Sequence, residues 1–205
     1  MNYLSDVDQL ANRFRVMRHG QSKANEAGVI VAAIESDRRG DYGLSELGLR
    51  QARAAADACG LPADTVIRSS DFSRARETAE VVRERLGAAE VITAEALRER
   101  SFGDLEGEPV ASYARVWEDD EAGTGQVHGV EPAAAVLDRV TALVADLERR
   151  YSGRDILLVS HGDTLQILQA GFLRLDPSLH RRLPPLGTAE IRELHLAGEP
   201  SRPRP

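Results

Sequence analysis

Two histidines in this sequence could do chemistry because of the residues beside them. His19 and His161 each stand directly before a glycine, and Arg18 precedes the first of them. A histidine can act as a nucleophile or hold a proton near neutral pH, and a following glycine permits close backbone approach to a bulky anion. Arg18 and Arg74 would supply planar, permanently charged groups that suit phosphate oxygens. The combination predicts a cationic pocket for a dianionic ligand.

Taken singly, these residues also have ordinary structural explanations. A histidine before a glycine is usually a loop residue without a catalytic role. An arginine in a polar run such as 73–77 usually lies in solvent and pairs with a nearby carboxylate. Their joint occurrence at the ends of apolar segments favours the functional interpretation.

The apolar pattern predicts the elements that would carry these residues. Short strands are expected at 14–17, 65–67, 91–93 and 156–159, and the last is almost wholly apolar, as a central parallel strand is. Helices are expected at 45–58 with Ser45 as its cap, at 73–86, at 131–150 and from 162 to about 173, with an edge strand within 190–196. This alternation predicts an α/β fold: a three-layer sandwich with a mostly parallel central sheet, helices on both faces, an antiparallel edge strand and a small cap insertion.

The length of 205 residues suggests a single domain. Within residues 1–205, we expect an N-terminal extension at 1–13, a loop region or cap at about 100–130, and a loose tail at 198–205. The sequence shows no internal repeat.

Three polar clusters follow expected strands, at 18–25, 69–76 and 160–163. Parallel sheets bind their ligands at the carboxyl ends of the strands. One shared site is therefore expected at this edge, and the helix that begins near Ser73 could also direct its amides at an anion there.

Composition narrows the class of protein. The formal net charge of −7 argues against nonspecific nucleic-acid binding. No apolar run approaches the roughly 20 residues needed to span a bilayer. The first residues are acidic and lack the basic segment followed by an apolar segment that is typical of a signal peptide. A cytoplasmic location is expected, without nucleic-acid or membrane partners. Cys59 is the sole cysteine, which excludes an intramolecular disulfide.

Five runs in the same order make the chain resemble the histidine phosphatase superfamily, the phosphoglycerate-mutase-like enzymes. The runs are 16–25, 44–52, 69–79, 97–107 and 158–163. The resemblance implies that His19 is a nucleophile whose imidazole nitrogen attacks phosphorus, and a phosphohistidine would divide a hard transfer into two easier ones. The residues that match phosphate contacts in the family are Arg18, Ser22, Asn25, Arg74 and His161.

Glu99 matches the family's proton donor to the leaving oxygen. Such an acid must hold a proton near neutral pH, which requires burial or a neighbouring anion. Asp104 and Glu106 are rival candidates in the same run, and position within the run favours Glu99. His19 would need to be neutral and His161 would be more useful protonated, so we expect environments that push their pKa values apart.

Three functions remain open at this point: phosphomonoester hydrolysis, mutase-type phosphoryl transfer, and binding of a phospho-ligand by a catalytically weak protein. A mutase needs an enclosing, cationic cap. The interval from Glu99 to His161 is short, and Arg115 and His128 are the only basic residues within 108–130. The sequence therefore favours a phosphatase that needs no metal or cofactor and acts on a small phosphorylated metabolite.

Other residues receive structural explanations. The acidic run 118–121 is expected to be solvated surface, and Tyr113 and Trp117, four residues apart, to pack within a cap. The arginine pair 38–39 could contact a second anionic group on the substrate, although solvated surface is favoured. Histidines without metal-ligand spacing are His128, His180 and His195, and no metal site is expected. The segments that match the family least well, and are expected to set substrate identity, are 26–43 and 106–135.

Overall fold

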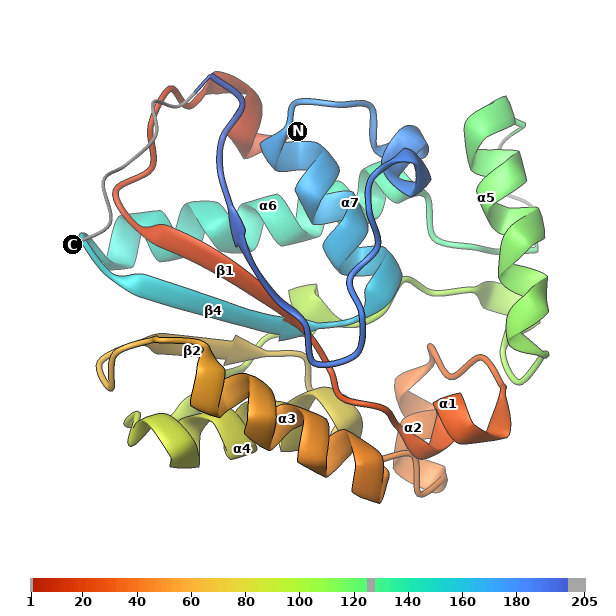
Figure 1. Cartoon of the computed structure of the whole chain (residues 1–205). Coiled ribbons are helices and arrows are strands. Elements are labelled where there is room, and N and C mark those ends of the chain that lie inside the picture. The colour runs from red at the N-terminus through yellow and green to blue at the C-terminus, as the bar shows by residue number, and fades with distance from the viewer. Residues whose placement is uncertain (1, 125–127, 199–205) are drawn as a thin grey trace.

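The computed structural model describes residues 2–124 and 128–198. Its centre is one five-stranded sheet in the order β3-β2-β4-β1-β5 (Figure 1). The strands are β1 Arg13–Arg18, β2 Val66–Ser69, β3 Val91–Thr93, β4 Asp155–Ser160 and β5 Ile191–Leu194. The first four run parallel, whereas β5 pairs antiparallel with β1 at the edge. The predicted mostly parallel sheet with an antiparallel edge strand is confirmed.

Helices cover both faces of the sheet. The helices α3 Glu46–Ala58 and α4 Ser73–Leu86 lie on one face, and α6 Ala133–Arg150 and α7 Gly162–Phe172 lie on the other (Figure 1). Central strand β4 shows why: every residue is buried, with Ile156 and Leu158 in one apolar cluster and Leu157 and Val159 in the other. Successive side chains of a strand point to opposite faces, so an apolar run without alternation fits a strand covered on both sides.

Three short helices lie in segments where the sequence predicts loops: α1 Lys23–Ala27, α2 Ile34–Arg39 and α5 Tyr113–Ala122. They were not predicted because they are short and carry no long apolar stripe. Helix α5 stands apart from the sheet and turns part of the region 100–130 into a helical cap (Figure 1).

The N-terminal extension packs on the core. It contains the 3-10 helix Tyr3–Asp6, and Leu4 and Leu10 are buried in the cluster beneath α6 and α7. Most of the expected tail, residues 199–205, lies outside the described residues. Among the residues described, no helix is long and apolar enough to cross a bilayer.

Helix α3 is held directly against the loop that follows β1. Ser45 caps the helix as predicted, and its hydroxyl accepts a hydrogen bond from the amide of Gly48 at 3.1 Å. A Cβ atom at Gly48 would lie 2.0 Å from the carbonyl oxygen of Gln21, and one at Gly20 would lie 2.5 Å from the carbonyl oxygen of Gly48. The glycine after His19 therefore permits close approach to the α3 backbone, rather than to an anion as the sequence suggested.

Candidate functional site

The carboxyl edge of the sheet brings the three polar clusters together. Arg18 at the end of β1 is paired with Ser160 at the end of β4, and the amide of His19 donates to the Ser160 carbonyl at 3.0 Å. The His19 and His161 rings then meet edge to face, with centroids 5.2 Å apart. Arg74 reaches the same place from the first turn of α4. Adjacent parallel strands thus create a compact cationic site from distant parts of the sequence.

His19 is held in one neutral tautomer. Its Nδ1 atom lies 2.7 Å from the carbonyl oxygen of Gly20, which can only accept, so Nδ1 carries the proton. Arg74 Nε donates to His19 Nε2 at 3.1 Å, so Nε2 presents a lone pair. Burial, reinforced by the charges of Arg74 and Arg18, holds the pKa of His19 well below its usual value. The imidazole is therefore neutral, and its lone pair is on Nε2.

His161 is fixed through its opposite ring atom. Its Nε2 lies 2.9 Å from Ser70 Oγ, which itself accepts from the amide of Phe72 at 3.3 Å. Among the described residues Ser70 Oγ has no other acceptor, so its hydroxyl donates to His161 Nε2 and the ring proton lies on Nδ1. His161 is fully buried and does not line the cavity itself. Its ring lies beside that of His19 and is a neutral donor through Nδ1.

The expectation that the two histidines have diverging pKa values is wrong for this structure. Burial is the largest cause in both, and Arg74 opposes the charged form of each ring, so the pKa of His161 is also held well below its usual value. The sequence could not show that both rings share one desolvated, cationic environment. Both rings carry their proton on Nδ1, and they differ in the ring atom left for a ligand: the lone pair of Nε2 in His19 and the Nδ1 proton in His161.

Three buried donors face this site without an acceptor among the described residues: Arg18 Nε, Arg74 Nη1 and His161 Nδ1. Arg18 is anchored by Nη1 on the Leu186 carbonyl at 2.9 Å, and Arg74 by Nη2 on the Val31 carbonyl at 2.9 Å. Buried donors are normally satisfied. A phosphoryl group has the charge and the acceptor oxygens to satisfy all three.

The amide end of α4 is already used by the protein. Asp37 of α2 is buried, and its Oδ2 accepts from the Ser73 amide at 2.9 Å and the Ser73 hydroxyl at 2.7 Å. Its Oδ1 lies 3.7 Å from Arg74 Nη1. The predicted use of this helix end for a ligand anion is therefore wrong, since a carboxylate of the chain occupies it and also steadies Arg74.

Ser22 and Asn25 form the capping box of α1 and both line the cavity. Asn25 Oδ1 accepts from the Ser22 amide at 3.0 Å and from the Ser22 hydroxyl at 3.1 Å. With Oδ1 so occupied, the amide nitrogen of Asn25 is the group left to donate. Asn25 is thus better placed than Ser22 to reach a ligand.

Glu99 lies on the cavity wall and is held through one oxygen. Its Oε1 accepts from the Arg100 amide at 3.0 Å and from the Thr164 amide and hydroxyl at 3.1 and 3.0 Å. Oε1 therefore stays an acceptor, and a proton on this carboxyl resides on Oε2. Burial, followed by the charge of Asp163, raises the pKa of Glu99. This is the environment that a proton donor requires.

The rival acids lie elsewhere. Asp104 is exposed, and Glu106 Oε2 accepts from the amides of Ala32 and Ala33 at 2.9 and 3.2 Å. Neither lines the cavity that contains His19. The geometry favours Glu99.

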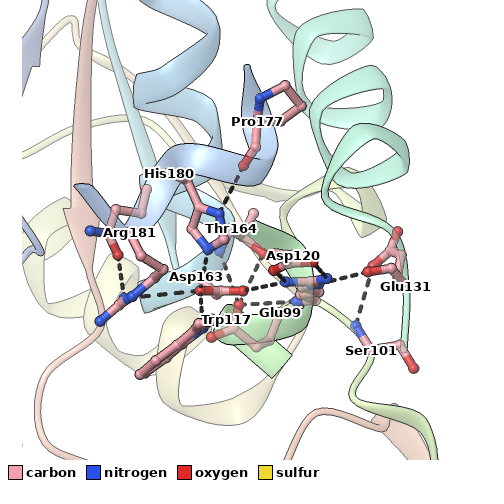
Figure 2. A network of polar contacts seen from close by, with 12 residues as sticks. Glu99, Ser101, Trp117, Asp120, Glu131, Asp163, Thr164, Pro177, His180 and Arg181 are labelled. Atoms are coloured by element: carbon pink, nitrogen blue, oxygen red, sulfur yellow. Dashed lines mark hydrogen bonds and ion pairs between the residues drawn. The ribbon is translucent and has the colours of Figure 1, made fainter. Parts of the chain in front are cut away.

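A buried network behind Glu99 escaped sequence reasoning (Figure 2). Its centre is Asp163, which accepts from Trp117 Nε1 at 3.0 Å, His180 Nε2 at 2.9 Å and Arg100 Nη1 at 3.2 Å. Although burial raises the pKa of Asp163, the His180 hydrogen bond and the Arg100 charge lower it overall. Asp120, from the run expected to be solvated, binds Arg100 through two hydrogen bonds of 2.6 and 2.7 Å. No spacing in the sequence connects these residues.

A cavity of ≈ 400 Å³ opens in front of His19, Arg18, Arg74 and Glu99. Its outer wall is formed by Val29, Val31, Val110, Tyr113, Trp117, Gln166, Arg181, Pro185 and Leu186. The segments 26–43 and 106–135 contribute to this wall as expected, but the stretch that follows α7 does so too. Tyr113 and Trp117 stack with centroids 5.5 Å apart, so they pack together as predicted while also facing the cavity.

The remaining sequence candidates lie away from the cavity. Arg38 and Arg39 are exposed on α2 and do not line it, which agrees with the favoured expectation of solvated surface. In the described part of the chain, no group of three or more His, Cys, Asp and Glu side chains is arranged to hold a metal ion.

Comparison with known proteins agrees with this geometry. The sequence pattern of the histidine phosphatase superfamily (branch 1) matches residues 14–203. Glucosyl-3-phosphoglycerate phosphatase of Mycobacterium tuberculosis is 33% identical over 199 residues, covering 90% of this chain and 85% of its own. A 2,3-bisphosphoglycerate-dependent phosphoglycerate mutase of Parvibaculum lavamentivorans is 33% identical over 177 residues, covering 78% of this chain and 79% of its own.

A solved structure extends the agreement to three dimensions. The mycobacterial glucosyl-3-phosphoglycerate phosphatase in complex with inorganic phosphate superposes with a TM-score of 0.71 at 33% identity, covering 88% of each chain. Sequence pattern, relatives and fold coincide over nearly the whole length. The chain therefore belongs to the histidine phosphatase superfamily.

Proposed function

We propose that this chain hydrolyses phosphate monoesters of small metabolites through a phosphohistidine at Nε2 of His19. The observation that carries the proposal is the fixed tautomer of His19. The Gly20 carbonyl holds the Nδ1 proton, and Arg74 marks the free lone pair on Nε2. The three donors around it that lack a hydrogen-bond acceptor, two of them on arginines, supply the polar and positive surroundings that a transferring phosphoryl group needs.

In the first step, Nε2 of His19 attacks phosphorus in line, and the bond from phosphorus to the leaving oxygen breaks. Arg74 Nε shifts from Nε2 to a phosphoryl oxygen, which Arg18 and the Nδ1 proton of His161 also contact. An alkoxide leaves poorly, so Glu99 transfers its Oε2 proton to the leaving oxygen. The products are an alcohol, phosphohistidine and the Glu99 carboxylate.

In the second step, the Glu99 carboxylate takes a proton from water as the water oxygen attacks phosphorus. The bond between phosphorus and nitrogen breaks, and its electron pair returns to Nε2 of His19. Inorganic phosphate leaves, and Glu99 is protonated again. Both acid–base roles of Glu99 use the same raised pKa.

Water is favoured as the acceptor because the cap is acidic and small. Helix α5 carries the acidic run 118–121, and its one basic residue is Arg115. A mutase must keep a charged intermediate bound while it reorients, which needs a cationic enclosure. Mutase-type transfer, suggested by the relative from Parvibaculum, is the second candidate. Ligand binding without turnover is disfavoured because His19, Glu99, Arg74 and His161 are all in place.

Metal-independent turnover is part of the proposal, because His19 and Glu99 together supply the nucleophile and the acid. A relative from Arabidopsis thaliana that is 31% identical over 179 residues is named a metal-independent phosphoserine phosphatase. A cytoplasmic location stays a prediction of the sequence.

The test is a phosphatase assay across sugar phosphates, phosphoglycerates, nucleotides and p-nitrophenyl phosphate, with and without a chelator. We expect phosphate release that the chelator does not change, and an acid-labile phosphoenzyme that is absent in His19→Ala and present in the control His195→Ala. His195 is exposed and lies outside the cavity. Chelator-sensitive turnover, or full activity of His19→Ala, would overturn the mechanism. Interconversion of phosphoglycerates that outpaces phosphate release would favour the mutase.

A further inference from the structure

A third arginine lines the cavity, and neither the chemistry above nor the sequence motifs use it. Arg181 lies in the 3-10 helix Pro177–Arg182, which follows α7, and faces the cavity beside Trp117 (Figure 2). Its side chain is 31% exposed. Burial lowers the pKa of Arg181, Asp163 and Glu99 raise it, and Arg18 lowers it, so this cation lies within electrostatic range of both the phosphate site and the proton donor.

The guanidinium of Arg181 is only partly used by the protein. Nη1 donates to Gln166 Oε1. Asp163 lies 4.0 Å away, and its oxygens already receive three shorter hydrogen bonds from Arg100, Trp117 and His180. Among the described residues, Nε and Nη2 of Arg181 have no acceptor. These two atoms form one edge of the guanidinium fork.

That edge is the one this chain uses elsewhere to bind a carboxylate. Arg98 Nε and Nη2 contact the two carboxylate oxygens of Asp71 at 2.9 and 2.7 Å. A guanidinium edge matches a carboxylate with two parallel hydrogen bonds. The free edge of Arg181 can therefore bind both oxygens of one carboxylate, whereas the third oxygen of a second phosphoryl group would receive no donor from this edge.

The orientation of Arg181 is fixed before any ligand arrives. Its Cζ atom lies 3.6 Å from the centroid of the Trp117 ring. Trp117 is itself held by its stacking with Tyr113 and by its hydrogen bond to Asp163. A fork that is already oriented loses little conformational entropy on binding, so its contact contributes more to affinity.

We propose that Arg181 binds a carboxylate on the leaving group, so that the preferred substrates are phosphate monoesters of hydroxy acids. This inference rests on the proposed function, because Arg18 and Arg74 must be engaged by the phosphoryl group for Arg181 to be left for the leaving group. The proton from Glu99 then goes to the ester oxygen between the two anionic groups. The alcohol product retains the carboxylate.

The kinetic test compares two substrates that differ in this group alone. 3-Phosphoglycerate has a carboxylate where glycerol 3-phosphate has a hydroxymethyl group. We expect Arg181→Gln to lower kcat/KM for 3-phosphoglycerate by about 10- to 100-fold, the effect of a lost charge-assisted pair. For glycerol 3-phosphate the change should stay within about threefold. Arg181→Lys keeps the charge but loses the two parallel donors of the guanidinium. It should therefore restore part of the kcat/KM that Arg181→Gln loses on 3-phosphoglycerate.

Arg182→Gln is the matched control. Arg182 is the next residue of the same 3-10 helix, is 63% exposed and pairs with Glu121, so its loss should affect both substrates equally and weakly. An equal loss on both substrates in Arg181→Gln would assign Arg181 to the phosphoryl group or to folding and overturn the inference. So would a wild-type preference for a bisphosphate without a carboxylate over 3-phosphoglycerate.

A binding measurement separates this inference from the proposed function. Trp117 is the only tryptophan of the chain, so its fluorescence reports on ligands beside Arg181. In His19→Ala, which cannot form a phosphoenzyme, 3-phosphoglycerate should bind at least about tenfold more tightly than glycerol 3-phosphate, and adding Arg181→Gln should remove the difference. Equal affinities would overturn the carboxylate subsite whether or not the wild type turns over. Conversely, absence of phosphate release with the binding difference intact would overturn hydrolysis alone.

Discussion

Strands β1 and β4 are each followed by a histidine, and the two rings share one tautomer but offer opposite groups to a ligand. At the end of β1, the Gly20 carbonyl fixes the Nδ1 proton of His19 and leaves Nε2 as a base. At the end of β4, the Ser70 hydroxyl binds Nε2 of His161 and leaves Nδ1 as a donor. Burial and the same arginines keep both rings neutral. The comparison teaches that the placement of one hydrogen bond, rather than charge, decides whether a neutral imidazole here offers a lone pair or a donor.

The largest effect should separate the two histidines themselves. His19→Asn should lower kcat by at least about 10⁵-fold, because the nucleophile is lost. His161→Asn should lower kcat by about 10³-fold, the cost of one donor to the transition state, while a phosphoenzyme still forms. Rapid-quench trapping checks this contrast. A trappable phosphoenzyme in His19→Asn, or none in His161→Asn, would reverse the assigned roles.

Glu99→Gln should have an effect that depends on the leaving group. For an alkyl ester, we expect kcat/KM to fall by about 10³-fold, because the alkoxide leaves without a proton. For p-nitrophenyl phosphate, whose leaving group needs no proton, the fall should be about tenfold or less. Dephosphorylation loses its base in both cases, so a burst of nitrophenol should appear. Equal losses in kcat/KM would show that Glu99 is not the acid.

Asp163→Asn should shift the pH profile. Protonated Glu99 is the active acid, so activity on an alkyl ester is present below the raised pKa of Glu99 and falls as the pH rises through it. Asp163 contributes to that raised pKa, so its neutralisation should move the alkaline limb to lower pH. Burial, the larger cause of the raised pKa of Glu99, is unchanged by this substitution. The control is Asp146→Asn. Asp146 forms ion pairs with Arg149 and Arg150 outside the cavity, so this substitution should leave the alkaline limb of the pH profile unchanged.

The smallest effect should come from Ser70→Ala. This substitution removes the hydrogen bond to His161 Nε2, so the His161 ring is no longer held in one tautomer. A single neutral hydrogen bond corresponds to about tenfold in kcat. Ser69→Ala is the control, since the Ser69 hydroxyl donates to the Ser70 carbonyl and, within residues 2–124 and 128–198, does not contact His161. A ¹⁵N NMR spectrum of the histidine rings should show mixed tautomers for His161 and an unchanged His19. If the tautomers are unchanged and activity is full, Ser70 does not hold the proton of His161 on Nδ1.

The phosphate end of the cavity could be predicted from sequence because its residues lie at the ends of strands or in the loops and first helical turns that follow them. Strand ends are visible as apolar runs, and parallel strands bring their carboxyl ends together. The leaving-group end could not be predicted in the same way. Trp117, Arg181 and Leu186 come from α5, a 3-10 helix and an irregular segment, none of which has a periodic pattern.

Tautomers and buried networks were also beyond the sequence. His180 and Asp163 are joined by a 2.9 Å contact that depends on how α7 and the 3-10 helix pack, not on their spacing. The pKa directions of His19 and His161 follow from shared burial. Helices α3, α4 and α6 were found correctly because each carries apolar residues at helical spacing. Helix α7, which is buried almost throughout, was found from its place after the strand 156–159.

The position of β4 in the sheet has a consequence for biosynthesis. It lies between β2 and β1, and each of these strands pairs with it along its length. A growing chain that has produced β1, β2 and their helices therefore has no surface on which to bring Arg18 and Arg74 together. We expect nascent chains to lack phosphate affinity until α7 has emerged, so that the site appears abruptly near the end of translation.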